Sequence, residues 1–226
     1  MPVEASGLLI VPHPRLARYL ALGDSYTIGE GVDPQDAWPA QLVRALNARG
    51  IPVAAPEIIA ATGWTTADLV RAIAVAEPVG PYSLVTVLSG VNTQYRGMSV
   101  PVYRGQFRRL LRRAVALAGS GDCVIVVSIP DWGVTPFNTR RSRPRVAQAI
   151  DSFNRANQRE AATAGTHWVD VTDLSREDPL AVTGDGLHPN AAMYTRWVGR
   201  IAPVATQALR ESLAASDWRA IRGARA

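Results

Sequence analysis

The sequence contains no lysine, one cysteine, three histidines and no long hydrophobic run, and each shortage narrows the class of protein. Because Cys123 is the only cysteine, no intramolecular disulfide can form, and its apolar surroundings predict a buried, unreactive thiol. No apolar stretch approaches the roughly 20 residues that a membrane-spanning helix needs. The first 14 residues have no basic segment of the kind that begins a secretory signal. We therefore predict a soluble, cytoplasmic protein, although a secreted form that has lost its signal would look the same.

Arginine carries all of the positive side-chain charge, and the net charge is +5. Such an excess can indicate a nucleic acid or another anionic surface as a partner. However, Arg104, Arg108 and Arg112 are spaced by four residues, which places them along one face of a predicted helix. No aromatic residues are interleaved with them to form a stacking platform for bases. We interpret this stretch as a solvent-exposed helix face and expect no nucleic-acid partner.

Short apolar runs alternate with longer helical patterns, and this alternation is typical of an α/β domain with a mainly parallel sheet. The predicted strands span residues 18–22, 53–60, 84–88, 123–129 and 168–171. The predicted helices span residues 38–49, 66–76, 102–118, 145–164 and 191 to about 214. With no internal repeat and no linker, the pattern favours one domain over residues 1–226, with a core at about 17–214 and a basic tail at 217–226.

A serine follows the first predicted strand in the stretch Gly-Asp-Ser-Tyr-Thr-Ile-Gly, which places Ser25 in a glycine-bearing turn. Open parallel sheets carry their reactive groups in the loops beyond the carboxyl ends of the strands. A serine hydroxyl is a weak nucleophile at neutral pH and needs a base nearby. Without such a base, the same stretch would be an ordinary turn.

His188 is the candidate base because it alone among the three histidines has a carboxylate, Asp185, three residues before it. His13 stands between two prolines near the N-terminus, and His167 leads into a predicted strand. In an Asp-x-x-His turn the carboxylate can fold back onto one imidazole nitrogen, which leaves the other nitrogen free to accept the serine proton. The alternative is that Asp185 shapes a turn and His188 caps the next helix. The presence of Ser25 in the same chain favours catalysis.

Two further residues follow the second and third predicted strands. Gly63 can present its backbone N–H at close range, and Asn92 can offer its side-chain amide. Hydrogen-bond donors of this kind are needed for the oxygen that becomes negative during acyl transfer. Each residue alone would be an ordinary loop residue. Their order along the chain places both at the same edge of the predicted sheet as Ser25 and His188.

These four blocks, present in order from Leu20 to about Met193, resemble those of the SGNH hydrolase family, also called GDSL-like lipases and esterases. The resemblance implies a flavodoxin-like three-layer α/β/α sandwich with a five-stranded parallel sheet. It implies no metal and no organic cofactor. Two positions depart from the common pattern: Tyr26 follows the serine where the family name has leucine, and Thr93 follows the asparagine where many members have aspartate.

By position, the resemblance assigns Ser25 as nucleophile, His188 as general base and then acid, and Asp185 as its orienting partner. It assigns the oxyanion hole to the N–H groups of Ser25 and Gly63 and to the side chain of Asn92. The expected activity is that of a serine esterase, which hydrolyses carboxylic esters with short-chain acyl or acetyl groups through an acyl-enzyme on Ser25.

The substrate is expected to be a small-molecule ester, and three aromatic residues near the predicted site are candidates for lining its pocket: Trp64, Tyr95 and Trp132. Packing alone would explain each of them equally well. A thioesterase or a carbohydrate deacetylase would use the same site. From another class, a non-catalytic binding module that kept the fold is the alternative. Such a module is expected to have lost at least one residue of the Ser-Asp-His set, and all three remain.

Overall fold

The computed structural model describes residues 16–223 and contains one sheet of five parallel strands in the order β2-β1-β3-β4-β5. The strands are β1 (Tyr19–Asp24), β2 (Glu57–Ala61), β3 (Leu84–Val87), β4 (Val124–Val127) and β5 (His167–Val169). Every residue of β1, β3 and β4 is buried, as expected for central strands covered on both faces. The predicted five-stranded parallel α/β fold is confirmed.

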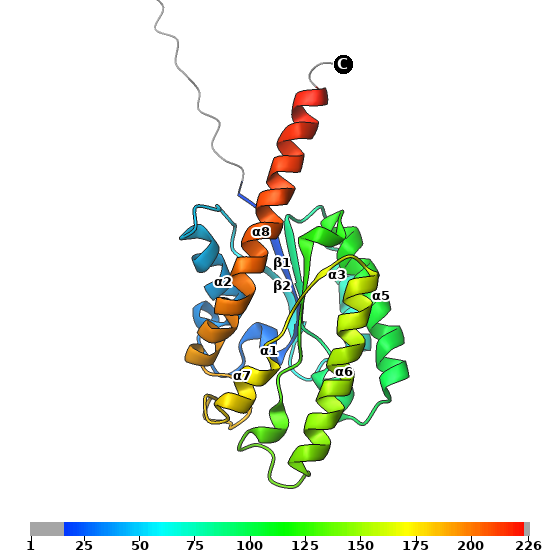
Figure 1. Cartoon of the computed structure of the whole chain (residues 1–226), viewed down its shortest axis with the longest axis vertical. Coiled ribbons are helices and arrows are strands. Elements are labelled where there is room, and N and C mark those ends of the chain that lie inside the picture. Colours follow the sequence, from blue (N-terminus) through cyan, green and yellow to red (C-terminus); the bar gives the residue numbers. More distant parts are fainter. Residues whose placement is uncertain (1–15, 224–226) are drawn as a thin grey trace, which may run out of the picture.

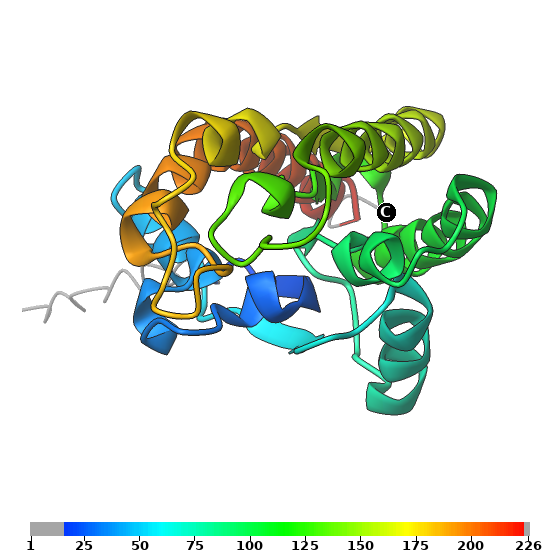
Figure 2. The same ribbon diagram turned by 90° about the horizontal axis from the view of Figure 1, so that it is seen from below.

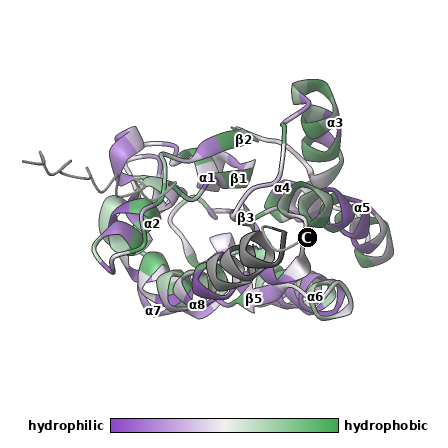
Figure 3. Cartoon of the chain, turned by 90° about the horizontal axis from the view of Figure 1, so that it is seen from above, coloured by the Kyte–Doolittle hydropathy of each residue, from purple (hydrophilic) through white to green (hydrophobic). Residues whose placement is uncertain are grey.

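Helices cover both faces of the sheet and give three layers (Figures 1 and 3). On one face lie α2 (Trp38–Asn47) and α8 (Ala191–Gly223), which pack against each other. On the other face lie α3 (Thr66–Ala76), α5 (Val100–Ala118) and α6 (Arg143–Thr163). The connection from β1 leads to β2 at one edge of the sheet, whereas the connections from β2 to β3, β4 and β5 run in the opposite direction across it. Because such connections are right-handed, α2 lies on one face of the sheet and α3, α5 and α6 lie on the other.

Most predicted element boundaries lie within two residues of the observed ones, and two differ by more. Strand β2 begins at Glu57 and not at Val53, because Pro56 has no N–H to donate to a ladder, and Val53 forms only an isolated bridge with Ala17. Helix α8 continues to Gly223, through most of the segment predicted as a tail, whereas residues 224–226 lie outside the described part of the chain. Between residues 16 and 223, no helix is both long enough and apolar enough to cross a membrane.

Several short helices that the sequence pattern did not predict lie between the strands and the longer helices. They are α1 (Ser25–Ile28), α4 (Val91–Tyr95) and α7 (Thr172–Glu177), together with the 3-10 turns η1 (Pro34–Asp36), η2 (Gly121–Cys123) and η3 (Trp132–Val134). In the view from below, α1, the segment after β4 and the segment before α8 gather at one end of the sheet (Figure 2). This end carries the carboxyl ends of the parallel strands, where reactive groups are expected.

Candidate active site

Ser25 is the first residue of α1 and lies against His188, which is 163 residues away in the chain. Its Oγ is 2.9 Å from His188 Nε2, and both side chains are buried. The other ring nitrogen, Nδ1, is 2.5 Å from Asp185 Oδ2. The structure therefore brings together in one hydrogen-bonded chain the three residues that the sequence placed in two distant blocks.

Asp185 is held in its position by a tight turn. Its Oδ1 accepts hydrogen bonds from the Thr183 hydroxyl at 2.8 Å and from the backbone N–H groups of Leu187 and His188 at 2.8 and 3.0 Å. Gly186, at φ 72°, supplies the left-handed backbone that the turn requires. Burial acts to raise the pKa of Asp185, but the hydrogen bonds from His188 and the neighbouring donors hold it below its ordinary value. The group is thus a fixed carboxylate acceptor for the Nδ1 proton.

With Nδ1–H donated to Asp185, Nε2 of His188 is left as the acceptor for the Ser25 hydroxyl proton. The ring of Tyr26 lies 5.4 Å from the imidazole, centroid to centroid, and packs against one face of it. A hydroxyl, an imidazole and a carboxylate in this order can perform nucleophilic acyl transfer.

Asn92 and Gly63 lie in the segments after β3 and β2, Asn92 in the short helix α4 and Gly63 in the turn before α3. Asn92 Nδ2 donates one hydrogen bond to the Trp64 carbonyl at 3.1 Å, and its second hydrogen can serve another acceptor. Gly63 has φ 77°, and its carbonyl accepts a hydrogen bond from Arg96. The N–H of Ser25 is the first of α1 and so has no partner within the helix. The three predicted donors for an oxyanion therefore come from the segments that follow the three neighbouring strands β1, β2 and β3.

Thr93 stands where many family members have aspartate, and it joins two of these loops. Its buried hydroxyl accepts a hydrogen bond from the Thr66 N–H at 3.0 Å and lies 3.2 Å from the Thr66 hydroxyl. Thr66 in turn contacts Ser89, at the end of β3. The neutral hydroxyl network thus holds the Asn92 loop against the start of α3 without an aspartate at this position.

A cavity of about 140 Å³ opens beside Ser25, Asn92 and His188. Its walls are otherwise apolar or aromatic and are formed by Tyr26, Val91, Tyr95, Trp132, Phe137 and Leu187. The Tyr95 and Trp132 rings meet edge to face at 5.2 Å. Two of the three predicted lining aromatics, Tyr95 and Trp132, are therefore present. Trp64 is not part of this wall, because its side chain packs against the hydrophobic core.

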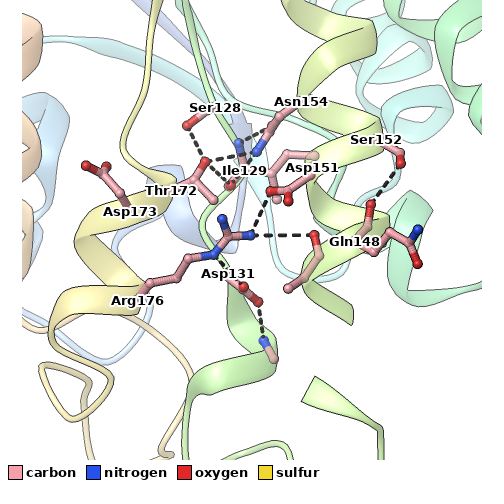
Figure 4. Close-up of polar contacts among 12 residues, drawn as sticks. Ser128, Ile129, Asp131, Gln148, Asp151, Ser152, Asn154, Thr172, Asp173 and Arg176 are labelled. Carbon is pink, nitrogen blue, oxygen red and sulfur yellow. Dashed lines mark hydrogen bonds and ion pairs between the residues drawn. The ribbon is translucent and has the colours of Figure 1, made fainter. Parts of the chain in front are cut away.

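The segment that carries Trp132 is fixed by an ion pair between a buried aspartate and a half-buried arginine (Figure 4). Asp131 is fully buried, and its two oxygens accept hydrogen bonds from the Gly133 N–H at 2.9 Å and from Arg176 Nε at 2.8 Å. Arg176, from α7, also donates to Asp151 on α6 at 2.7 Å. The aromatic wall is thus tied to two helices and not left to the mobility of a loop.

Asp24, which precedes Ser25, is a buried carboxylate with incomplete hydrogen bonding. One oxygen accepts from the Tyr26 N–H at 3.1 Å, whereas Oδ2 has no hydrogen-bond partner among the described residues. Burial raises the pKa of Asp24 to about 7 from an ordinary value of 3.8. Between these two pH values the native protein holds a proton that the unfolded chain has lost.

We therefore expect stability to fall as pH rises from about 4 to 7, and Asp24→Asn to remove this dependence. The folded-state pKa of an acid raised by burial makes the native state bind more protons, so the slope of stability against pH is negative in this window. The free energy of unfolding of the variant minus that of the wild type should be larger at pH 8.5 than at pH 4.5, by up to about 4 kcal/mol. Urea titrations at the two pH values measure this. Equal differences at both would show that Asp24 is ionised in the folded protein throughout.

Four residues near the reacting atoms escaped the sequence reasoning: Glu30, Tyr26, Val91 and Leu187. Three of them are sequence neighbours of predicted site residues: Tyr26 follows Ser25, Val91 precedes Asn92 and Leu187 precedes His188. This adjacency in the chain is the sequence signal that could have identified them. Glu30 has no such signal. Its Oε2 lies 3.8 Å from His188 Nε2 because the chain folds back after α1.

The model of the GDSL-like lipase/acylhydrolase family matches residues 21–196. No curated protein matches the chain in sequence.

Many solved structures resemble this fold. TesA has a TM-score of 0.68 at 21% identity, over 84% of this chain and 99% of its own. AlinE4, an SGNH-hydrolase family esterase, has a TM-score of 0.63 at 21% identity, over 83% and 93%. A lipase/acylhydrolase from Enterococcus faecalis has a TM-score of 0.63 at 20% identity, over 85% and 96%. At these identities the likeness shows the fold.

Proposed function

Because the chain belongs to the GDSL-like lipase/acylhydrolase family, we propose that it hydrolyses short-chain carboxylic esters through an acyl-enzyme on Ser25. The observation that carries the proposal is the chain of hydrogen bonds from Ser25 Oγ through His188 to Asp185, at 2.9 and 2.5 Å. The chain lies beside an apolar cavity that can receive one part of an ester.

In the acylation step, Ser25 Oγ attacks the ester carbonyl carbon while His188 Nε2 takes the hydroxyl proton. The carbonyl oxygen becomes negative and accepts hydrogen bonds from the N–H groups of Ser25 and Gly63 and from Asn92 Nδ2. The intermediate collapses, the bond to the alcohol oxygen breaks, and His188 returns its proton to that oxygen. Asp185 remains a carboxylate throughout and stabilises the imidazolium, in keeping with its lowered pKa.

In the deacylation step, water takes the place of the departed alcohol next to His188. Nε2 removes a proton from the water, the resulting hydroxide adds to the acyl carbon, and the same donors stabilise the second oxyanion. Collapse of this intermediate releases the carboxylic acid and returns the proton to Ser25 Oγ.

The size of the apolar cavity sets the acyl groups that we expect. Its volume of about 140 Å³ is close to that of an engineered protein cavity that holds benzene, so it accommodates an acyl group of a few carbons. Longer chains must displace Tyr95, Trp132 or Phe137, and forcing extra methylenes into a packed site typically costs about 1–3 kcal/mol.

On a series of p-nitrophenyl esters from acetate to palmitate, kcat/KM should therefore be highest at two to four carbons. It should fall at least about tenfold by eight carbons. Phe137→Ala, which removes a half-exposed wall, should move the optimum to longer chains. A wild-type preference for palmitate would refute the assignment of this cavity to the acyl group.

A further inference from the structure

A second carboxylate, Glu30, faces the nitrogen of His188 that contacts Ser25. Its Oε2 is 3.8 Å from His188 Nε2 and accepts a hydrogen bond from the Thr62 hydroxyl at 2.5 Å. Its backbone N–H donates to the Ser25 carbonyl at 3.1 Å, which fixes the start of the side chain relative to the nucleophile. Oε1 forms no hydrogen bond within the described part of the chain. Glu30 thus presents a positioned, partly exposed acceptor beside the reacting atoms.

Glu30 lies near the reacting atoms but outside the apolar cavity, so Ser25 has a polar neighbour as well as an apolar pocket. The cavity wall is aromatic and aliphatic and includes neither Glu30 nor Thr62. In ester hydrolysis the leaving oxygen must reach His188 Nε2 to receive its proton. The alcohol part of the substrate is therefore the part that comes within reach of Glu30, while the acyl part occupies the apolar cavity.

The side chains shown near this alcohol position are polar. Glu30 supplies a carboxylate, and Thr62 supplies the hydroxyl that donates to it. None of the described arginines forms an ion pair with Glu30. A carboxylate disfavours an anionic alcohol and accepts strong hydrogen bonds from the hydroxyl groups of a neutral one.

Building on the esterase function proposed above, we infer that Glu30 and Thr62 form a subsite for the leaving alcohol. The substrate class that fits is an ester of a short acid with a neutral, hydroxyl-bearing alcohol, such as a polyol or a sugar. Hydrolysis then consumes one water and releases the acid and the free polyol. Glu30 acts here as a specificity-determining residue, because its hydrogen bonds are made to the alcohol and not to the acyl group.

The test compares glycerol monoacetate with n-propyl acetate, which share the acyl group and the three-carbon alcohol but differ by two hydroxyl groups. Acetate release gives kcat/KM for both esters in the wild type, Glu30→Ala, Glu30→Gln and Asp33→Asn. The ratio of glycerol monoacetate to n-propyl acetate should fall about tenfold in Glu30→Ala, the size expected for loss of a charge-assisted hydrogen bond. In Glu30→Gln, which keeps one acceptor oxygen, the ratio should lie between those of the wild type and Glu30→Ala. Asp33→Asn removes the same charge from an exposed residue of the same loop and should keep the wild-type ratio.

Two results would overturn the subsite. An equal loss on both esters in Glu30→Ala would mean that Glu30 acts on His188 and not on the alcohol. A wild-type preference for acetylcholine over its neutral isostere 3,3-dimethylbutyl acetate, lost in Glu30→Ala, would mean that the subsite binds a cation. Failure of the esterase function itself is separate, since it would appear as p-nitrophenyl acetate turnover that persists in Ser25→Ala.

Discussion

Ser25→Ala should lower kcat/KM for p-nitrophenyl acetate by at least about 10⁴-fold and leave the free energy of unfolding within about 1 kcal/mol of the wild type. The activity falls because the attacking oxygen is removed and no acyl-enzyme can form. The stability changes little because the side chain makes one hydrogen bond, to His188, and alanine is well tolerated in a helix.

Steady-state kinetics together with urea unfolding of both proteins measures the two effects. Unchanged turnover in the folded variant would remove Ser25 from the mechanism. If Ser25→Ala failed to fold, its lost turnover would not identify the nucleophile. Ser25→Cys, a variant of similar volume, then tests the role of the side chain in a folded protein. A cysteine at this position should form the acyl-enzyme and then turn over slowly.

Asp185→Asn should lower kcat by about 10⁴-fold while preserving the turn that carries His188. The asparagine oxygen can still accept the hydrogen bonds that Oδ1 now receives from Leu187 and His188. Its amide group, however, donates to Nδ1 and thereby favours the tautomer with the proton on Nε2. That imidazole cannot accept the Ser25 proton, so the chemical step fails although the three residues remain in place.

Thr183→Val is the matched control for Asp185→Asn, because it removes one hydrogen bond at 2.8 Å from the same carboxylate without altering the contact to His188. We expect a loss of less than about tenfold for this variant, because the backbone N–H groups of Leu187 and His188 still hold the carboxylate. If both variants lose the same factor, the role of Asp185 is to hold the turn and not to set the tautomer of His188.

Much of the fold could be predicted because its three central strands are buried on both faces. The runs Leu-Val-Thr-Val and Val-Ile-Val-Val of β3 and β4 are continuous apolar segments, and a helical pattern follows each of them. The helix α3 was predicted with its observed ends because the capping box of Thr65 and Asp68 marks its start in the sequence. The end of α8 was missed because no glycine or proline stops the helical pattern before Gly223.

The arginine spacing predicted a shared helix face but not the residue that lies against it. Arg104 and Arg108 are about half exposed, and both donate to Glu160, whose side chain is buried on α6 more than 50 residues away. The hydrogen bonds from Arg108 are the main reason that the pKa of Glu160 is lowered to about 2. A partner on another helix is set by tertiary packing, which the spacing along one helix does not contain.

For the site, sequence spacing predicted which residues would meet but not the direction of their neighbours. Ser25, Asn92 and His188 follow from their positions after the strands and before the last helix. Trp64 and Trp132 both follow strands, yet only the buried Trp132 lines the cavity, whereas Trp64 is partly buried against the core outside it. The approach of Glu30 to His188 likewise depends on the path of the chain after α1.

The central claim is a covalent acyl-enzyme on Ser25, and the most direct test is to trap it. The protein would be treated with a serine-directed fluorophosphonate, digested and analysed by mass spectrometry, in parallel with Asp185→Asn and with protein unfolded in urea. We predict one adduct, on the peptide that contains Ser25, formed far more slowly in Asp185→Asn and absent from the unfolded chain. Labelling of a different residue, or none in the folded wild type, would contradict the account.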